Sequence, residues 1–224
     1  MPVIENIPIR MKPADIRKKM RLPEKYAERG EVDRFVAEVL PLLQPRAVYE
    51  LEEITHKNDL GIQVGRILFN SRVLARNVRD AERVFPFILT IGDRLEKKAA
   101  EEDDLLCQYV LEGIGDLALH AVDRYVKETV CRMHGITRLS SMSPGSLSDW
   151  PIEEQKPLFS LLKQGSGVIG VRLTDNLLML PRKSLSGIYF STKREFFSCR
   201  LCPRENCPGR LAPYDDELKK SYRI

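Results

Sequence analysis

A long amphipathic helix constrains the fold of this chain more than any other feature of the sequence. Between residues 103 and 134, apolar residues recur at steps of three or four, which places them along one face of a helix. They are Leu106, Val110, Ile114, Leu117, Ala121 and Tyr125. Asp103 and Asp104 suit the positively polarised start of a helix, and Gly135 can end it. We expect this helix to be the spine of the domain, because its apolar face needs a large surface to pack on.

The other periodic segments predict shorter helices and a set of strands. Helices are expected over residues 13–43, with a kink or stop at Pro41, and over 151–163; strands are expected within 46–69, over 84–91, and near 168–174, 177–180 and 185–191. This pattern predicts the α+β fold class, with helices packed on a largely antiparallel sheet. We interpret residues 1–195 as one domain and residues 196–224 as an irregular C-terminal tail that carries cysteines.

Glycines interrupt two of these segments. Gly113 and Gly115 lie inside the long helix, where glycine is unfavourable, and we interpret them as places of close packing or bending rather than of ligand contact. Residues 165–170 are glycine-rich but precede a strand instead of joining a strand to a helix, so we interpret them as a turn.

Composition excludes several classes of function. Lysine and arginine total 36 against 32 acidic residues, and the two kinds are interleaved, so a nucleic-acid partner is not expected. No apolar run approaches the ~20 residues that cross a bilayer, and the N-terminus lacks the pattern of a signal peptide, so no membrane partner is expected. Five cysteines, an odd number, suit a reduced, cytoplasmic location better than a disulfide framework.

Three segments, residues 143–151, 170–176 and 181–190, carry a family resemblance. Taken alone, the first predicts a turn at Pro144 and Gly145 followed by a helix, and the third a turn into a strand. In this order and at these spacings, they resemble the activation domain of cobalamin-dependent methionine synthase and its stand-alone relatives. Residues 87–92 and 111–116 extend the resemblance over roughly residues 60–192.

The resemblance implies a site for S-adenosylmethionine. In the family, an Arg-x-x-x-Gly-Tyr motif holds this ligand, and its glycine falls on Gly145, so Ser141 and Ser146 stand at the arginine and tyrosine positions. A serine offers one neutral hydrogen bond where an arginine pairs a carboxylate twice, so weak binding is expected. An aromatic pair of the family falls on Tyr189 and Phe190, which could equally be ordinary strand residues. The implied ligand-binding residues are Ser141, Met142, Pro144, Gly145, Ser146, Tyr189 and Phe190.

The function implied by the resemblance is that of an accessory protein in methionine synthesis. It would assist the reductive remethylation of a corrinoid methyltransferase, with S-adenosylmethionine as methyl donor, as part of that enzyme system rather than as an independent enzyme. Cobalamin would be reached only through a partner, either a separate corrinoid-binding protein or a core methionine synthase, and an electron donor would also be needed. Two alternatives stay open: a non-catalytic corrinoid-protein binding module, and an iron–sulfur electron donor.

The tail holds Cys199, Cys202 and Cys207 in a C-x2-C-x4-C pattern. Three thiols this close in a reducing compartment favour zinc or an iron–sulfur cluster over disulfides. The fourth ligand is unspecified, and free thiols are the alternative. The sequence does not determine the oligomeric state.

Overall fold

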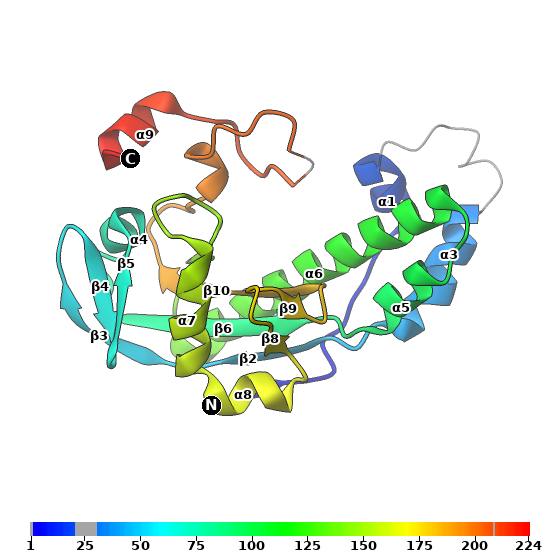
Figure 1. Cartoon of the computed structure of the whole chain (residues 1–224), viewed down its shortest axis with the longest axis horizontal. Helices are drawn as coiled ribbons and strands as arrows, with labels where there is room; N and C mark the ends of the chain where they lie inside the picture. The colour runs from blue at the N-terminus through cyan, green and yellow to red at the C-terminus, as the bar shows by residue number, and fades with distance from the viewer. Residues whose placement is uncertain (1, 21–30, 208) are drawn as a thin grey trace.

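The computed structural model describes residues 2–20, 31–207 and 209–224 (Figure 1). Residues 21–30 of the predicted helical region 13–43 lie outside that range. The helices are α1 (Pro13–Met20), α3 (Glu31–Val39), α4 (Arg72–Asn77), α5 (Arg94–Ala100), α6 (Leu105–His134), α7 (Gln155–Leu161), α8 (Lys163–Val168) and α9 (Asp216–Tyr222), with short 3-10 turns η1 (Leu40–Leu42), η2 (Ile152–Glu154) and η3 (Ser198–Arg200).

The strands form one antiparallel sheet and a separate small hairpin. The sheet contains β1 (Val3–Ile4), β2 (Arg46–Tyr49), β3 (Glu52–Lys57), β4 (Gly61–Val64), β5 (Ile67–Asn70), β6 (Arg83–Thr90), β7 (Leu139–Met142) and β10 (Ser184–Ser191), and the hairpin contains β8 (Arg172–Leu173) and β9 (Met179–Leu180). With helices on the sheet, the predicted α+β class is confirmed.

Strand β6 is the centre of the sheet. Strand β10 pairs with it along one edge, while β2 and β3 share the other edge, β2 beside residues 87–90 and β3 beside residues 83–84. Pro86 lies in the gap between these two partners, where Glu50 donates its backbone N–H to the Pro86 carbonyl. Because proline has no N–H, this is the position on the edge where its presence removes no ladder hydrogen bond.

Helix α6 covers one face of the sheet, as predicted (Figure 1). The Asp104 carboxylate accepts hydrogen bonds from the backbone N–H groups of Leu106 and Cys107, and Gly135 ends the helix with a φ of 65°. One row of buried residues follows steps of four, with Leu111, Gly115 and Thr129 buried beside it: Val110, Ile114, Ala118, Val122, Val126 and Val130. The predicted stripe is therefore wrong after Ile114. The small Ala118 lies in the interface, and the bulkier residues at 117 and 125 are half-buried beside it.

Alternation along β6 separates two apolar cores. Phe85, Phe87 and Leu89 face α6, with Tyr189 of β10 beside them; we call this the α6 core. Val84 faces the opposite side together with Met142, Trp150, Ile188 and Phe190, which we call the Trp150 core. Successive side chains of a strand point to opposite faces, so the central strands supply residues to both cores.

The length and apolar composition of helix α6 bear on the expectation that the chain has no membrane partner. By length and composition alone it could cross a bilayer, although Glu112 and Asp116 interrupt its run of apolar residues. Its apolar side chains pack on the sheet within the α6 core, an arrangement that a core helix of a globular domain shares.

The glycine-rich segment at 165–170 was predicted wrongly as a turn. It forms most of α8, which is followed by Gly170 in the left-handed region. Leu162 and Ile169 flank the helix and are buried against Val48 and Ile88 of the sheet. This packing outweighs the low helix propensity of glycine.

The interpretation of Gly113 and Gly115 as packing positions is confirmed. A β-carbon at Gly113 would overlap the Met20 side chain of α1, and one at Gly115 would lie 3.0 Å from Cε of Lys183. Both positions let neighbouring segments approach α6 closely.

A glycine pair tests how tightly the sheet is packed. We expect Gly187→Ala to lower the free energy of unfolding by about 1–3 kcal/mol, because its β-carbon would overlap the Met142 backbone carbonyl on β7. Gly167→Ala is the matched control: no atom lies within 4 Å of its β-carbon, and alanine in a helix stabilises by about 0.5–1 kcal/mol. Urea unfolding measures both, and equal stabilities would contradict the packing described.

Candidate functional site

The structure places four of the seven predicted ligand-binding residues on strands, divided between the two faces of the sheet, and the other three in the loop after β7. Strand β7 pairs with β10 so that Ser141 lies opposite Tyr189, and both face α6. Met142 and Phe190 point to the other face and are buried in the Trp150 core. The two aromatic rings therefore do not line one common surface.

Tyr189 is completely buried in the α6 core. Its ring stacks on Phe87 with centroids 3.7 Å apart and planes 4° from parallel, and its hydroxyl donates a hydrogen bond of 2.7 Å to Asp123. Lys127 pairs with the same carboxylate at 2.8 Å. Burial, together with the Asp123 charge, raises the pKa of Tyr189 well above its ordinary value. The ring thus already has a stacking partner and a hydrogen-bond partner within the chain.

The loop after β7 confirms the predicted turn at Pro144 and Gly145. Gly145 has a φ of 81° and donates its N–H to the Trp150 carbonyl, while the Ser146 hydroxyl donates to the Ser143 carbonyl at 2.6 Å. Pro144 is buried. These contacts define a rigid turn whose polar groups are largely satisfied internally.

Asp149 fixes this loop to helix α4, a role the sequence analysis missed. Its carboxylate accepts hydrogen bonds from the Ser71 hydroxyl at 2.5 Å and from the backbone N–H of Val73 at 2.9 Å. Ser71 is itself the N-cap of this helix, and its side chain accepts a hydrogen bond from the Leu74 N–H. An acidic residue three positions before the 3-10 turn η2 gave no local signal, because its partners lie far away in the sequence.

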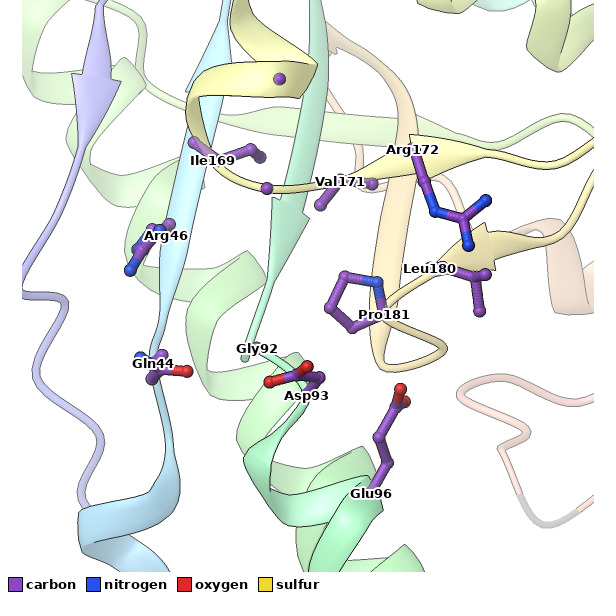
Figure 2. Close-up of a pocket in the computed structure, with 12 residues that line it drawn as sticks. Gln44, Arg46, Gly92, Asp93, Glu96, Ile169, Val171, Arg172, Leu180 and Pro181 are labelled. Carbon is purple, nitrogen blue, oxygen red and sulfur yellow. The ribbon is translucent and has the colours of Figure 1, made fainter.

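A cavity of about 610 Å³ lies between the hairpin β8–β9, the end of β6 and the start of α5 (Figure 2). It is built from two of the segments that carry the family resemblance, since its wall contains Gly170, Arg172 and Pro181. None of the seven predicted ligand-binding residues lines it. The lining residues are Gln44, Arg46, Gly92, Asp93, Glu96, Gly167, Ile169, Gly170, Val171, Arg172, Leu180 and Pro181.

Both signs of charge line this cavity. Arg46 and Arg172 form no ion pair within 4 Å in the part of the chain that the structure describes. Asp93 pairs with Lys97 at 2.6 Å, and its hydrogen bond from that lysine lowers the pKa of the Asp93 carboxyl. Glu96 accepts a hydrogen bond of 2.8 Å from the backbone N–H of Arg182. The arginines are therefore the groups available to bind an anion.

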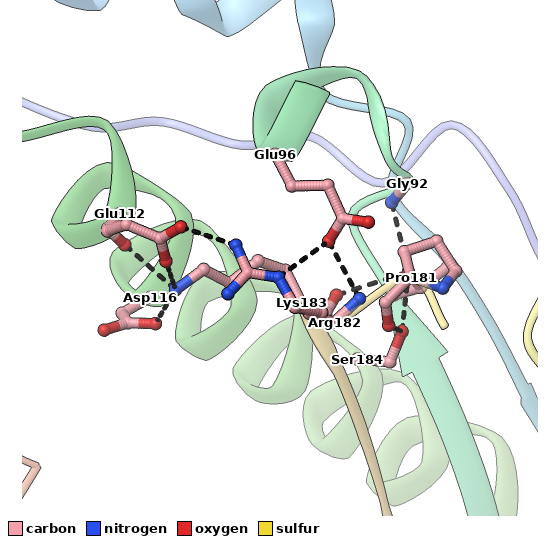
Figure 3. A network of polar contacts seen from close by, with 9 residues as sticks. Gly92, Glu96, Glu112, Asp116, Pro181, Arg182, Lys183 and Ser184 are labelled. Atoms are coloured by element: carbon pink, nitrogen blue, oxygen red, sulfur yellow. Dashed lines mark hydrogen bonds and ion pairs between the residues drawn. The ribbon is translucent and has the colours of Figure 1, made fainter. Parts of the chain in front are cut away.

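An ion-pair network secures the far wall of the cavity (Figure 3). Lys183 pairs with Glu112 at 2.7 Å and with Asp116 at 2.6 Å, and Arg182 pairs with Glu112 at 2.7 Å. Burial lowers the pKa of Lys183, but the two carboxylates outweigh it and the net pKa is raised. These contacts tie the segment after Pro181 to α5 and α6, which fixes one side of the cavity on rigid helices.

The three tail cysteines do not form a metal site in the structure. Among the described residues, which include Cys199, Cys202 and Cys207, no group of three or more His, Cys, Asp or Glu side chains is placed to hold a metal ion. All three are free thiols. The predicted zinc or iron–sulfur site is therefore not supported.

Arg210 supplies the positive charge that organises this part of the tail. Its guanidinium donates to the backbone carbonyls of Cys199 at 2.9 Å and Cys202 at 3.1 Å, and also to those of Arg204 and Ala212. The loop carbonyls thus converge on a side-chain cation.

Leu201 is 1% exposed and packs in the Trp150 core, so part of the tail is ordered against the domain. The predicted boundary at residues 195 and 196 stays a prediction.

Comparison with known proteins tests the resemblance to the methionine synthase activation domain. The family described as vitamin B12 dependent methionine synthase, activation domain, matches residues 142–209. The resemblance to this family is confirmed. Among solved structures, the MetH reactivation domain bound to AdoHcy matches with a TM-score of 0.61 and 17% identity, over 88% of this chain and 81% of that one. At that identity the match establishes a shared activation-domain fold. No curated protein matches the chain in sequence.

The ion-pair network predicts a specific acid sensitivity. Burial raises the pKa of Glu112, but Lys183 and Arg182 lower it more, so the net pKa lies below its ordinary value of 4.5. A carboxyl whose pKa is lower in the folded state stabilises the fold above its unfolded pKa, and this contribution is lost as pH falls through the folded pKa.

We therefore expect Glu112→Gln to be less stable than the parent protein at neutral pH and to lose less further stability between about pH 5 and pH 3. Urea unfolding across that range measures the effect. Glu128→Gln, on the exposed face of the same helix, is the control and should keep the parent profile. Parallel profiles for the parent and Glu112→Gln would contradict the proposed stabilisation.

Proposed function

We propose that this chain assists the reductive reactivation of a corrinoid methyltransferase in the cytoplasm, with S-adenosylmethionine as methyl donor. The observation that carries the proposal is the family match over residues 142–209, because this region builds strand β10 and one wall of the cavity. The activation-domain fold supports it, and the related MetH domain was solved with AdoHcy, the demethylated form of the proposed donor.

We propose the cavity as the binding site for this ligand. The methionine part of S-adenosylmethionine carries a carboxylate and an ammonium group, and the lining offers Arg46 and Arg172 for the first and Asp93 for the second. Ile169, Val171 and Leu180 provide apolar contact for the remainder. A volume of about 610 Å³ lies within the range of about 300–1,000 Å³ that is typical of small-molecule sites.

The role of the chain in this reaction is binding and orientation. An electron from a donor protein would reduce the cobalt of a corrinoid held by another polypeptide, and the methyl group would then pass to the cobalt and leave S-adenosylhomocysteine. The chain needs no acid or base for such a transfer, because its contribution is to hold the donor methyl group in line with its acceptor. Gly167 and Gly170 line the cavity without side chains that would cover it, so a bound ligand would be accessible to a docked partner.

The second candidate is a non-catalytic module that binds a corrinoid protein. It is favoured by Ser141 and Ser146, which replace the ligand-gripping residues of the family, and by the complete burial of Tyr189 and Phe190. A ligand titration separates the two candidates, because only the first requires a methyl donor.

Calorimetric titration with S-adenosylmethionine and S-adenosylhomocysteine tests the first candidate. We expect both to bind, and Arg172→Ala to weaken binding about 10- to 100-fold, since a charge-assisted hydrogen bond is worth about 1.5–3 kcal/mol. Arg66→Ala is the control, because Arg66 is an exposed arginine of the β4–β5 turn, away from the cavity lining. Absence of heat at millimolar ligand would favour the binding module instead.

A second variant separates the cavity from the site implied by the sequence. Ser141→Arg restores the arginine of the family motif, on the face shared with Tyr189. If S-adenosylmethionine binds in the cavity, we expect the affinity to stay within twofold of the parent value. Ser148→Arg, at an exposed position in the loop that follows β7, controls for added charge. A tenfold gain confined to Ser141→Arg would place the ligand at β7 and overturn the cavity assignment.

A further inference from the structure

A second groove, of about 710 Å³, concentrates positive charge at the opposite end of the sheet from α1. It lies between the β3–β4 turn, helix α4 and helix α9. Five cationic residues line it, and we call it the basic groove: Lys57, Arg72, Arg76, Arg79 and Arg223. Asp59 is the one acidic lining residue. In a chain with 36 basic and 32 acidic residues, five against one is a strong local excess.

These cations are available for a partner. All five side chains belong to exposed residues, and within the described residues none forms an ion pair with a carboxylate. Their like charges repel one another, so an anion in the groove would relieve a cost that the free chain carries.

Several contacts hold the groove in shape without neutralising it. Lys57 Nζ donates to the backbone carbonyls of Arg79 at 3.0 Å and Ala81 at 2.6 Å, which joins β3 to the end of α4. The Arg76 guanidinium lies 4.3 Å from the centre of the Tyr222 ring and donates to the Ser221 carbonyl, which joins α4 to α9. A pre-organised set of cations loses less entropy on binding than a flexible one.

The arginines form a line rather than a cluster. Arg72 and Arg76 are one helical turn apart on α4, and Arg79 follows three residues later. At 1.5 Å per residue, Arg72 and Arg76 are about 6 Å apart along the helix axis, and Arg79 lies in the turn that follows the end of α4 at Asn77. Leu60 stands at the rim with 57% of its surface exposed. A line of cations beside an apolar side chain fits an extended acidic peptide better than a compact anion such as phosphate.

The basic groove is also continuous with the loop that carries the family resemblance. Asp149 of that loop accepts a hydrogen bond from the backbone N–H of Arg72 at 3.3 Å. A protein seated on residues 143–150 would therefore reach Arg72 first and then the rest of the line.

We propose that the basic groove docks an acidic segment of a partner protein. That this partner is the corrinoid-bearing protein rests on the function proposed above; the groove itself does not.

The test uses the full chain and a fluorescein-labelled peptide of eight glutamates and two leucines. We expect it to bind, by fluorescence anisotropy, and to bind more weakly as salt rises from 50 to 300 mM, because exposed charges are screened. Arg72→Glu/Arg79→Glu should weaken binding at least tenfold. Lys12→Glu/Lys18→Glu makes the same change of net charge on exposed residues at and before α1, at the far end of the molecule, and should stay within twofold.

Three results would overturn the proposal: no binding of the peptide, equal losses in both double variants, or displacement of the peptide by inorganic tripolyphosphate at a lower concentration than by unlabelled peptide. The last would assign the groove to a small anion. Circular dichroism confirms that the variants are folded. Titration of the same variants with S-adenosylmethionine tests the two proposals separately. The basic groove variants should bind this ligand as the parent protein does. If neither the parent protein nor any variant binds it, only the proposed function is contradicted.

Discussion

The packing of helix α6 on the central strands is the interaction on which the rest of the structure depends. Phe85, Phe87 and Leu89 of β6 and Tyr189 of β10 form the surface that the helix covers. The stacked rings of Phe87 and Tyr189 join the two strands on this face, and the Tyr189 hydroxyl reaches Asp123 on the helix. The pair of Phe87 and Tyr189 thus links both central strands to helix α6. The same two strands supply residues to the Trp150 core on the opposite face of the sheet.

The two candidate surfaces depend on this frame in different ways. The cavity near Pro181 is fixed by charges that reach back to α6, since Lys183 and Arg182 meet carboxylates on that helix. The basic groove is fixed by hydrogen bonds from side chains to backbone carbonyls, which order Lys57 and Arg76 while leaving their charge without a counterion. In the first case charge serves to hold the site together, and in the second it remains free to attract a partner.

Local patterns in the sequence predicted the elements whose formation depends on local physics. The capping of α6 by Asp104, the strand over residues 84–91 and the turn at Gly145 all follow from short-range propensities. The failures share a different cause. Helix α8 forms because Leu162 and Ile169 are buried against distant strands, and Asp149 orders its loop through Ser71 and Val73, which lie 78 and 76 positions away in the sequence. The resemblance implies a ligand contact at Tyr189, whereas in the fold its ring is fully buried and stacked on Phe87.

The arginine at position 210 has a consequence for how the tail responds to its surroundings. A loop rich in thiols and held by a bound metal would change with metal supply, chelators and oxidation of its ligands. Here the cation that gathers the carbonyls of Cys199 and Cys202 is covalently part of the chain and stays charged at any physiological pH. The charge that holds the backbone of this loop is therefore carried by a side chain, and it acts on carbonyl groups rather than on the thiols.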